Sequence, residues 1–340
     1  MRKSDEILTL EKDNFVGQYF KGNKYNDCAV IFFPGAKLSE ERTLPMAEFL
    51  INEGYNVLVV GYYLWRDLPK EMWGIPVDYA ENAVKWLQNK EIKNIAVHGA
   101  STGSGYALLS ASLIPEISCV VAVSPFEYVM EGMKNELIPQ HCSQYTWKGK
   151  DVPYCSYAGL DKMSFMQAVR TFFKNRGDKY KLKDIGRYSY DTASISEEAR
   201  IKIENMKADL LLIAPQFDNC WPSETSVPRM LQLLKEKGYS YKVESTIYEY
   251  GSHLLGYAPP EMIESKRKLY AKMMPVEKDY PVECEKARKD STKLILDFID
   301  KWAKEKTKQY EDSTENTKVI KNDLGQQIDI DTKNCEQTER

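Results

Sequence analysis

The stretch that decides the fold is residues 95–106, which read Ile-Ala-Val-His-Gly-Ala-Ser-Thr-Gly-Ser-Gly-Tyr. It begins as a short apolar run and ends in small residues that open a helical pattern. Ser101 stands between the two parts, with Gly99 and Gly103 two positions to either side. Glycines at these positions let a strand and a helix pass close together while the serine projects from a sharp turn. The stretch therefore predicts a buried strand, a tight turn that carries the serine, and a helix whose N-terminus lies behind it.

Similar strand and helix patterns alternate on both sides of this stretch. Short apolar runs that stop at Gly, Pro or Ser suit parallel strands buried on both faces. They cover residues 29–33, 56–60, 95–97, 119–123 and 210–214. Helical patterns lie between them at residues 44–51, 77–87, 106–113 and 227–234. This alternation predicts an α/β protein with a mostly parallel central sheet and helices on both faces.

The spacing of these patterns also predicts how the chain is divided. The interval between Val123 and Leu210 is rich in aromatic residues and much longer than a plain crossover needs. We expect an inserted cap at about 126–208, over the carboxyl ends of the strands, where open α/β sheets bind ligands. Ser291 is a candidate N-cap for a last helix that closes the α/β domain, residues 1–303. Its apolar face would hold Leu294, Ile295, Phe298, Ile299 and Trp302.

Residues 304–340 are mostly charged and polar, and we expect a flexible polar tail there.

Composition excludes several classes of protein. The 340 residues include 47 Lys and Arg against 50 Asp and Glu, a net charge of −3, which argues against nucleic-acid binding. No apolar run approaches the roughly 20 residues that span a bilayer. The charged start leads into no apolar segment typical of secretion. The seven cysteines are scattered without a C-x-x-C pair, so we expect reduced thiols in a cytoplasmic protein. The sequence does not indicate an oligomeric state.

A serine at such a turn needs a base, and the chain has three histidines. His98 lies in the strand before the turn and cannot fold back onto Ser101. His141 lies in the cap, where a contact with substrate is possible and a structural role is commoner. His253 follows the strand-like residues 241–248 in a loop near the carboxyl edge of the sheet. We therefore predict that His253 is the base.

The acid that orients this histidine is expected between the serine and the histidine in the chain, the order typical of α/β-hydrolases. Asp218 stands just beyond the strand 210–214. Glu224 is the rival, but it falls at the start of the next helix, where a carboxylate is favoured by the helix dipole in any case. We predict Asp218.

The oxyanion formed during attack needs two backbone donors. One is expected from Thr102, directly after the serine. The other is expected from the loop that follows the strand at residues 29–33, with Ala36 preferred to Lys37. Lys37 is also a candidate substrate contact. No metal or cofactor is expected, since this chemistry needs neither.

Several short motifs around these residues resemble a known family. They are Gly54-Tyr55, Gly61-Tyr62-Tyr63, Asp67-Leu68-Pro69-Lys70, Tyr79-Ala80-Glu81-Asn82-Ala83-Val84, the loop from Asp218 to Glu224, and Gly251-Ser252-His253. Together, over roughly residues 28–260, they resemble the C-terminal domain of acyl-CoA thioesterases and bile acid-CoA:amino acid N-acyltransferases, a dienelactone-hydrolase-like α/β-hydrolase. Thr102 departs from the lysine usual after the nucleophile in that family. Mammalian members carry a β-sandwich domain in front, which we do not expect in the few residues before Cys28.

The resemblance implies an enzyme that cleaves an acyl-CoA thioester. Members that transfer acyl groups to amines tend to use cysteine at the turn, so Ser101 favours hydrolysis through an acyl-enzyme. The basic segment 170–183 could hold CoA phosphates, although a solvated helix face is the commoner meaning of such a charge run.

Three alternatives remain open. A carboxylesterase, dienelactone-hydrolase-like or peptidase-type serine hydrolase would share every catalytic residue. An N-acyltransferase would share the CoA substrate. A non-catalytic binding module is disfavoured by the intact serine, aspartate and histidine.

Overall fold

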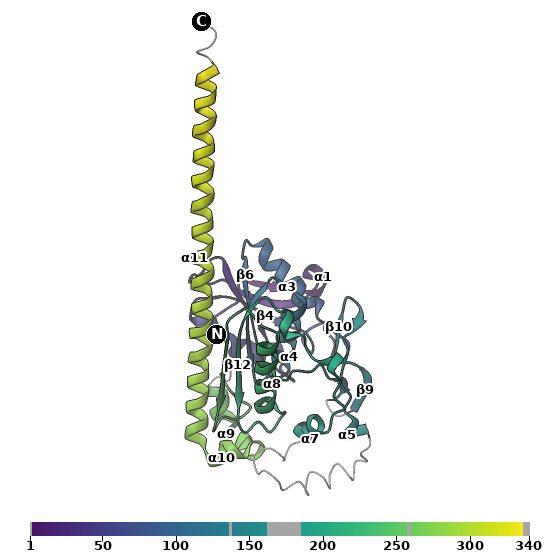
Figure 1. Cartoon of the computed structure of the whole chain (residues 1–340). Helices are drawn as coiled ribbons and strands as arrows, with labels where there is room; N and C mark the ends of the chain where they lie inside the picture. Colours follow the sequence, from purple (N-terminus) through teal and green to yellow (C-terminus); the bar gives the residue numbers. More distant parts are fainter. Residues whose placement is uncertain (1, 136–137, 162–184, 257–259, 336–340) are drawn as a thin grey trace.

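The computed structural model describes residues 2–135, 138–161, 185–256 and 260–335, and its centre is one eight-stranded sheet (Figure 1). From β4 to β13 all neighbouring strands are parallel, whereas β1 and β2 add an antiparallel edge. This is the α/β-hydrolase fold. In spatial order the strands are β1 (Glu6–Leu8), β2 (Val16–Phe20), β4 (Asn56–Gly61), β3 (Cys28–Phe33), β6 (Asn94–Ala100), β7 (Ile117–Val123), β12 (Asp209–Pro215) and β13 (Val243–Tyr248).

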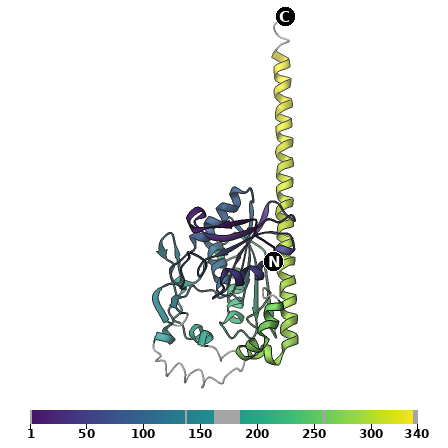
Figure 2. The same cartoon turned by 180° about the vertical axis from the view of Figure 1, so that it is seen from behind.

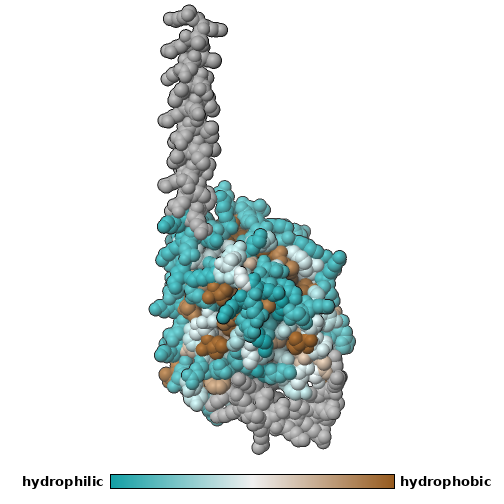
Figure 3. Space-filling view, viewed as in Figure 1, coloured by the Kyte–Doolittle hydropathy of each residue, from teal (hydrophilic) through white to brown (hydrophobic). Residues whose placement is uncertain are grey.

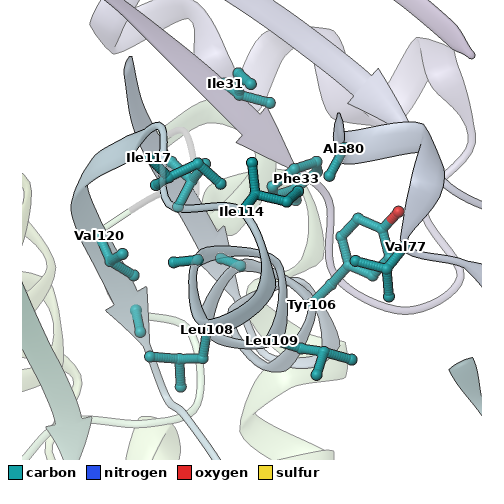
Figure 4. Close-up of a cluster of buried hydrophobic side chains, with 14 of the residues drawn as sticks. Ile31, Phe33, Val77, Ala80, Tyr106, Leu108, Leu109, Ile114, Ile117 and Val120 are labelled. Atoms are coloured by element: carbon teal, nitrogen blue, oxygen red, sulfur yellow. The ribbon is translucent and has the colours of Figure 1, made fainter. Parts of the chain in front are cut away.

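Helices cover both faces of this sheet, as the alternating pattern predicted. Side chains of one strand point alternately to the two faces, so Ile31 and Phe33 join one core cluster and Val30 and Phe32 the other. Figure 4 shows the first cluster, in which Tyr106, Leu108 and Leu109 of α4 lie close to residues of neighbouring strands. Helices next to the sheet include α2 (Glu40–Asn52), α3 (Asp78–Asn89), α4 (Thr102–Leu113) and α8 (Ser223–Glu236).

The long interval between β7 and β12 forms a separate layer of short elements, and its strands were not predicted from the sequence. A small core of its own includes Phe126, Met133, Tyr157 and Trp221. Because Trp221 belongs to the loop after β12, this core joins the insertion to the carboxyl edge of the sheet. The elements are β8 (Glu131–Lys134), β9 (Ile138–Ser143), β10 (Tyr145–Trp147), β11 (Lys150–Asp151), α5 (Ala158–Asp161), α7 (Ile185–Asp191), and the short 3₁₀ turns Glu197–Ala199 and Ile203–Asn205.

The C-terminal part of the structure differs from the sequence-based prediction. Three helices follow β13: α9 (Pro260–Met273), α10 (Pro275–Asp279) and α11 (Pro281–Cys335). Ser291 does not cap a helix, because α11 begins at Pro281, and its buried hydroxyl donates to the Ala287 carbonyl at 2.7 Å. A proline in the first turn of a helix gives up no intrahelical hydrogen bond, and this explains the earlier start.

The apolar face predicted for this helix is buried for Ile295, Phe298, Ile299 and Trp302. The helix also continues through most of the predicted flexible tail, and in both views it projects past the domain (Figures 1 and 2). Thr307 hydrogen-bonds to Asp27 at 3.0 Å, so the first part of that tail is attached to the domain. The tail contains many Lys, Glu and Gln residues, which have good helix propensity. They extend a helix that is already nucleated by the part of α11 packed on the domain.

The remaining short elements lie near the strands already described. They are α1 (Leu10–Asp13) and β5 (Ile75–Pro76), which pairs with β10. The face of the molecule in Figure 3 is mainly hydrophilic with separate hydrophobic patches, as is usual for a folded domain. Among the described residues, no helix is both long and apolar enough to cross a membrane.

Candidate active site

Ser101 occupies a strained turn between β6 and α4. Its backbone angles are φ 56° and ψ −127°, which non-glycine residues rarely adopt. The glycines on either side are needed for space, as the sequence predicted. A Cβ on Gly99 would lie 2.0 Å from the Gly103 carbonyl oxygen, and one on Gly103 would lie 2.4 Å from the Pro34 carbonyl oxygen. The close approach of strand, helix and loop therefore holds Ser101 in this turn at the carboxyl edge of the sheet.

Ser101, His253 and Asp218 lie in one hydrogen-bonded row. The Ser101 Oγ is 2.9 Å from His253 Nε2, and His253 Nδ1 is 2.8 and 3.0 Å from the two carboxylate oxygens of Asp218. Asp218 is fully buried, and His253 is 7% exposed. An aspartate that accepts from Nδ1–H leaves the Nε2 lone pair facing the serine hydroxyl. The arrangement can remove a proton from Ser101 as the serine attacks a carbonyl carbon.

The loop after β12 fixes the Asp218 carboxylate. Oδ1 accepts hydrogen bonds from the backbone N–H groups of Cys220 and Trp221, at 3.0 and 3.4 Å. Oδ2 accepts one from the hydroxyl of buried Ser223 at 2.5 Å. These donors orient the carboxylate toward His253. Ser223 was not predicted as part of the site, although it stands in the motif that resembles the family's acid loop.

Glu224, the rival for the acid, has a different partner. Its carboxylate pairs with the Arg187 guanidinium at 2.8 and 3.1 Å, and both side chains are buried. Arg187 also donates to the backbone carbonyls of Asp218, at 2.8 Å, and Trp221, at 3.3 Å. Arg187 belongs to α7 of the insertion, far from the acid loop in sequence. No local pattern could have predicted this contact.

The loop after β3 lies against the serine. A Cβ on Gly35 would be 3.3 Å from the Ala100 carbonyl oxygen and 3.6 Å from the Ser101 Cβ. Ala36 and Thr102, the two predicted oxyanion donors, both line the cavity that contains Ser101. Thr102 is the first residue of α4, where backbone N–H groups have no intrahelical acceptor.

The two tyrosines after β4 bond to residues next to these donors. The backbone N–H of Lys37, the alternative oxyanion donor, donates to the Tyr63 hydroxyl, so this N–H already has an acceptor. The Tyr62 hydroxyl donates to the Pro34 carbonyl at 2.7 Å and lies 3.1 Å from the Thr102 hydroxyl. Both come from the Gly-Tyr-Tyr motif noted in the sequence, which thus serves to position the loop after β3.

The other two histidines lie away from Ser101. His98 is completely buried in β6 and stacks on Phe32 at 4.8 Å, and burial lowers its pKa to about 3. His141 was a candidate substrate contact, but its side chain is 75% exposed and is not among the described residues that line the cavity. Its Nδ1 lies 3.0 Å from Glu131, which does line the cavity. In the described part of the chain, His141 thus contacts a residue of the cavity wall without lining the cavity itself.

The cavity above Ser101 has a volume of about 780 Å³. Most of its wall is apolar, with Leu38, Met46, Met72, Met133, Leu160 and Trp221 among the lining residues. Lys37 lines it together with the cations Arg42 and Lys266, and its contact with a substrate stays a prediction. Such a cavity accommodates an acyl chain next to a polar reacting group. The basic segment 170–183 lies outside the described residues.

Among the described residues, one group could hold a metal ion: Asp218, Cys220 and His253 place one ligand atom each within 4.8 Å of one another. Of these three side chains, Asp218 and His253 already form a hydrogen bond with each other, in the row that includes Ser101. A metal ion there would compete with the contact between His253 and Ser101.

Comparison with known proteins gives a consistent family match. The model of the family described as "BAAT / Acyl-CoA thioester hydrolase C terminal" matches residues 75–274. The peroxisomal succinyl-coenzyme A thioesterase of Mus musculus is 26% identical over 182 residues, which cover 52% of this chain and 38% of that protein. Acyl-coenzyme A thioesterase 1 of Rattus norvegicus is 33% identical over 97 residues, 28% of this chain and 22% of that protein. The chain thus matches well under half the length of these curated relatives.

Among solved structures, the esterase Pf2001 of Pyrococcus furiosus is similar over 80% of this chain and 90% of its own, with 23% identity and a TM-score of 0.45.

Proposed function

The chain belongs to the BAAT / acyl-CoA thioester hydrolase C-terminal family, a family of thioesterase and esterase hydrolases, and on this premise we propose that it hydrolyses acyl-CoA thioesters. The observation that carries the proposal is the row of Ser101, His253 and Asp218 at the cavity of about 780 Å³. A nucleophile, a base and an acid in this order suit acyl transfer to water. The apolar wall suits the acyl chain.

The proposed reaction has two halves. The Ser101 Oγ attacks the thioester carbonyl, and His253 Nε2 takes the hydroxyl proton. The backbone N–H groups of Thr102 and Ala36 stabilise the oxyanion, and Asp218 stabilises the protonated imidazole. The carbon–sulfur bond breaks, and the thiolate leaves with the proton from His253. Water then gives a proton to His253 and attacks the acyl-enzyme, which releases the carboxylic acid and restores Ser101.

Two features support hydrolysis of a CoA thioester over the alternatives. The thioester acyl-enzyme of a cysteine enzyme reacts readily with amines, whereas the oxyester that Ser101 forms reacts poorly with amines and is resolved by water that a histidine activates; this favours hydrolysis over transfer to an amine. The cavity is also lined by the cations Lys37, Arg42 and Lys266, whose positive charge suits the phosphates of a CoA leaving group.

Labelling by a fluorophosphonate tests the nucleophile. Wild-type chain should become labelled, and the Ser101→Ala variant should not. Equal labelling of the two, or none of the wild type, would refute the catalytic role of Ser101.

Thiol release from acyl-CoAs of varied chain length, measured beside aryl esters, tests the substrate. The proposal expects the higher kcat/KM with an acyl-CoA. Faster turnover of short aryl esters would favour a carboxylesterase, and an N-acyl product in the presence of glycine or taurine would favour transfer.

A further inference from the structure

One buried side chain in the cavity wall has an amide nitrogen with no hydrogen-bond partner in the described part of the chain. Gln144 lies between β9 and β10, lines the cavity and is only 7% exposed. Its Nε2 has no hydrogen-bond acceptor among the described residues. A buried donor without an acceptor costs free energy, so such groups in binding cavities are commonly satisfied by a ligand.

The position of this amide is fixed relative to Ser101. The Gln144 N–H donates to the Met130 carbonyl at 3.1 Å, and its carbonyl accepts from Ile75 N–H at 3.0 Å. The next residue, Tyr145, extends its hydroxyl to within 3.4 Å of the Thr102 carbonyl oxygen in the first turn of α4. The backbone at Gln144 is therefore held, and this restricts its side chain to one part of the wall.

A buried carboxylate comes from the strand that pairs with the residue before Gln144. Glu131 of β8 pairs with Ser143 of β9, the residue before Gln144, and it lines the same cavity. Its side chain has no exposed surface and accepts hydrogen bonds from the backbone N–H groups of His141 at 2.6 Å and Tyr157 at 3.1 Å. A second carboxylate brought to this part of the wall would be repelled, and in a buried site this repulsion is weakly screened.

We propose that Gln144 binds a neutral oxygen of the acyl group, a hydroxyl or keto oxygen, so that the preferred substrates are oxygenated acyl thioesters. This inference rests on the proposed function. A plain hydrocarbon chain leaves the Gln144 Nε2 unpaired, and a terminal carboxylate meets the charge of Glu131. Because Nε2 is covered in the structure, a rotation of the Gln144 side chain must first turn it toward the cavity, and a neutral oxygen then accepts from it without either cost. The hydrocarbon part of the acyl group would contact the apolar residues of the same wall, Met72, Met133 and Leu160.

The test measures how the 340-residue chain hydrolyses a series of eight-carbon acyl groups: octanoyl, hydroxyoctanoyl and oxooctanoyl with the oxygen at several positions, and octanedioyl. Each is supplied as a CoA thioester and as a 4-nitrophenyl ester, and kcat/KM is measured. For at least one oxygenated acyl group, kcat/KM should exceed that for octanoyl by about 3- to 10-fold, the range expected for one hydrogen bond. The value for octanedioyl should be the lowest of the series.

Variants assign this preference to the amide. In Gln144→Leu the ratio of oxygenated to plain acyl group should fall to about one. In Met133→Leu, a nearly isosteric change in the same wall, the ratio should persist. The inference is overturned if octanoyl equals or exceeds every oxygenated group in the wild type, or if Gln144→Leu keeps the wild-type ratio.

Two further readouts separate this inference from the proposed function. If only the aryl esters are hydrolysed, the thioesterase proposal fails while the acyl preference is still measured on the esters. If neither series is hydrolysed, binding of octanamide and the hydroxyoctanamides, measured by calorimetry, decides: tighter binding of a hydroxylated amide that is lost in Gln144→Leu supports the inference, and equal binding overturns it.

Discussion

The guanidinium of Arg187 donates a hydrogen bond to the backbone carbonyl of Asp218 at 2.8 Å. Through this contact a helix of the insertion holds the loop that carries the candidate catalytic acid. The same guanidinium pairs with Glu224 at 2.8 Å, and both side chains are almost fully buried. The cap and the acid loop therefore share one buried ion pair, so the placement of one is linked to the placement of the other.

Removal of Arg187 should destabilise the chain strongly. Arg187→Met leaves Glu224 as a buried carboxylate without its cation, a change that typically costs about 3–5 kcal/mol in the free energy of unfolding. Chemical denaturation of the purified variant measures this loss.

The double variant Arg187→Met with Glu224→Leu is the matched control. Because it removes both charges, it should recover much of the lost stability. The stability of Glu224→Leu alone is measured as well. If the double variant lost as much free energy of unfolding as Arg187→Met and Glu224→Leu together, the two residues would not be energetically coupled.

Asp218 and Glu224 should respond very differently to neutralisation. In Asp218→Asn the amide can donate to Nδ1 and thereby favour the wrong imidazole tautomer, and we expect kcat to fall by about 10⁴-fold. In Glu224→Gln the side chain can still accept from Arg187, and kcat should change by less than about tenfold. Hydrolysis of an aryl ester gives both values, with circular dichroism as the control for folding. If Glu224→Gln lost more activity than Asp218→Asn, Glu224 would be the acid.

Two glycines of α4 offer a sharp test of the turn. A Cβ at Gly103 would lie 2.4 Å from the Pro34 carbonyl oxygen and 2.7 Å from that of Phe33, whereas one at Gly105 meets nothing within 4 Å. Gly103→Ala must shift backbone next to Ser101, so we expect loss of fluorophosphonate labelling and a lower melting temperature. Gly105→Ala should stabilise the helix by up to about 1 kcal/mol. Similar effects of the two substitutions on labelling would contradict this account of the turn.

Local patterns were sufficient to predict much of this structure. The strand, turn and helix around Ser101 follow from small residues next to an apolar run, and the buried strands follow from short apolar segments. The positions of His253 and Asp218 follow from the strands that precede them, because parallel strands bring their carboxyl ends to one edge of the sheet. In the structure His253 Nε2 lies 2.9 Å from the Ser101 Oγ, and His253 Nδ1 lies 2.8 Å from an Asp218 carboxylate oxygen.

Contacts between distant segments were not predictable in the same way. Arg187 and Gln144 lie in the insertion, where short strands lack the long apolar runs of the sheet, and each meets residues far away in sequence. The start of α11 was wrongly placed at Ser291, because a serine before an apolar face fits an N-cap while a buried hydroxyl inside a helix leaves no local signal.

His98 should make the stability of the chain depend on pH. It is completely buried in β6, stacked on Phe32, and neither ring nitrogen has a hydrogen-bond partner among the described residues. Burial lowers its pKa from 6.5 to about 3. The unfolded chain therefore binds a proton at this site between these two values while the folded chain does not. This contribution to stability is complete above pH 6.5 and is lost as the pH falls toward 3.

Comparison with His98→Phe isolates this contribution, because phenylalanine can stack on Phe32 and does not titrate. From pH 8 to pH 5 the wild type should lose about 2 kcal/mol more of its free energy of unfolding than the variant does. Urea denaturation at both pH values gives the four free energies. Losses of equal size in the two proteins would mean that His98 takes up its proton in the folded chain, through a rearrangement of β6 that exposes the imidazole.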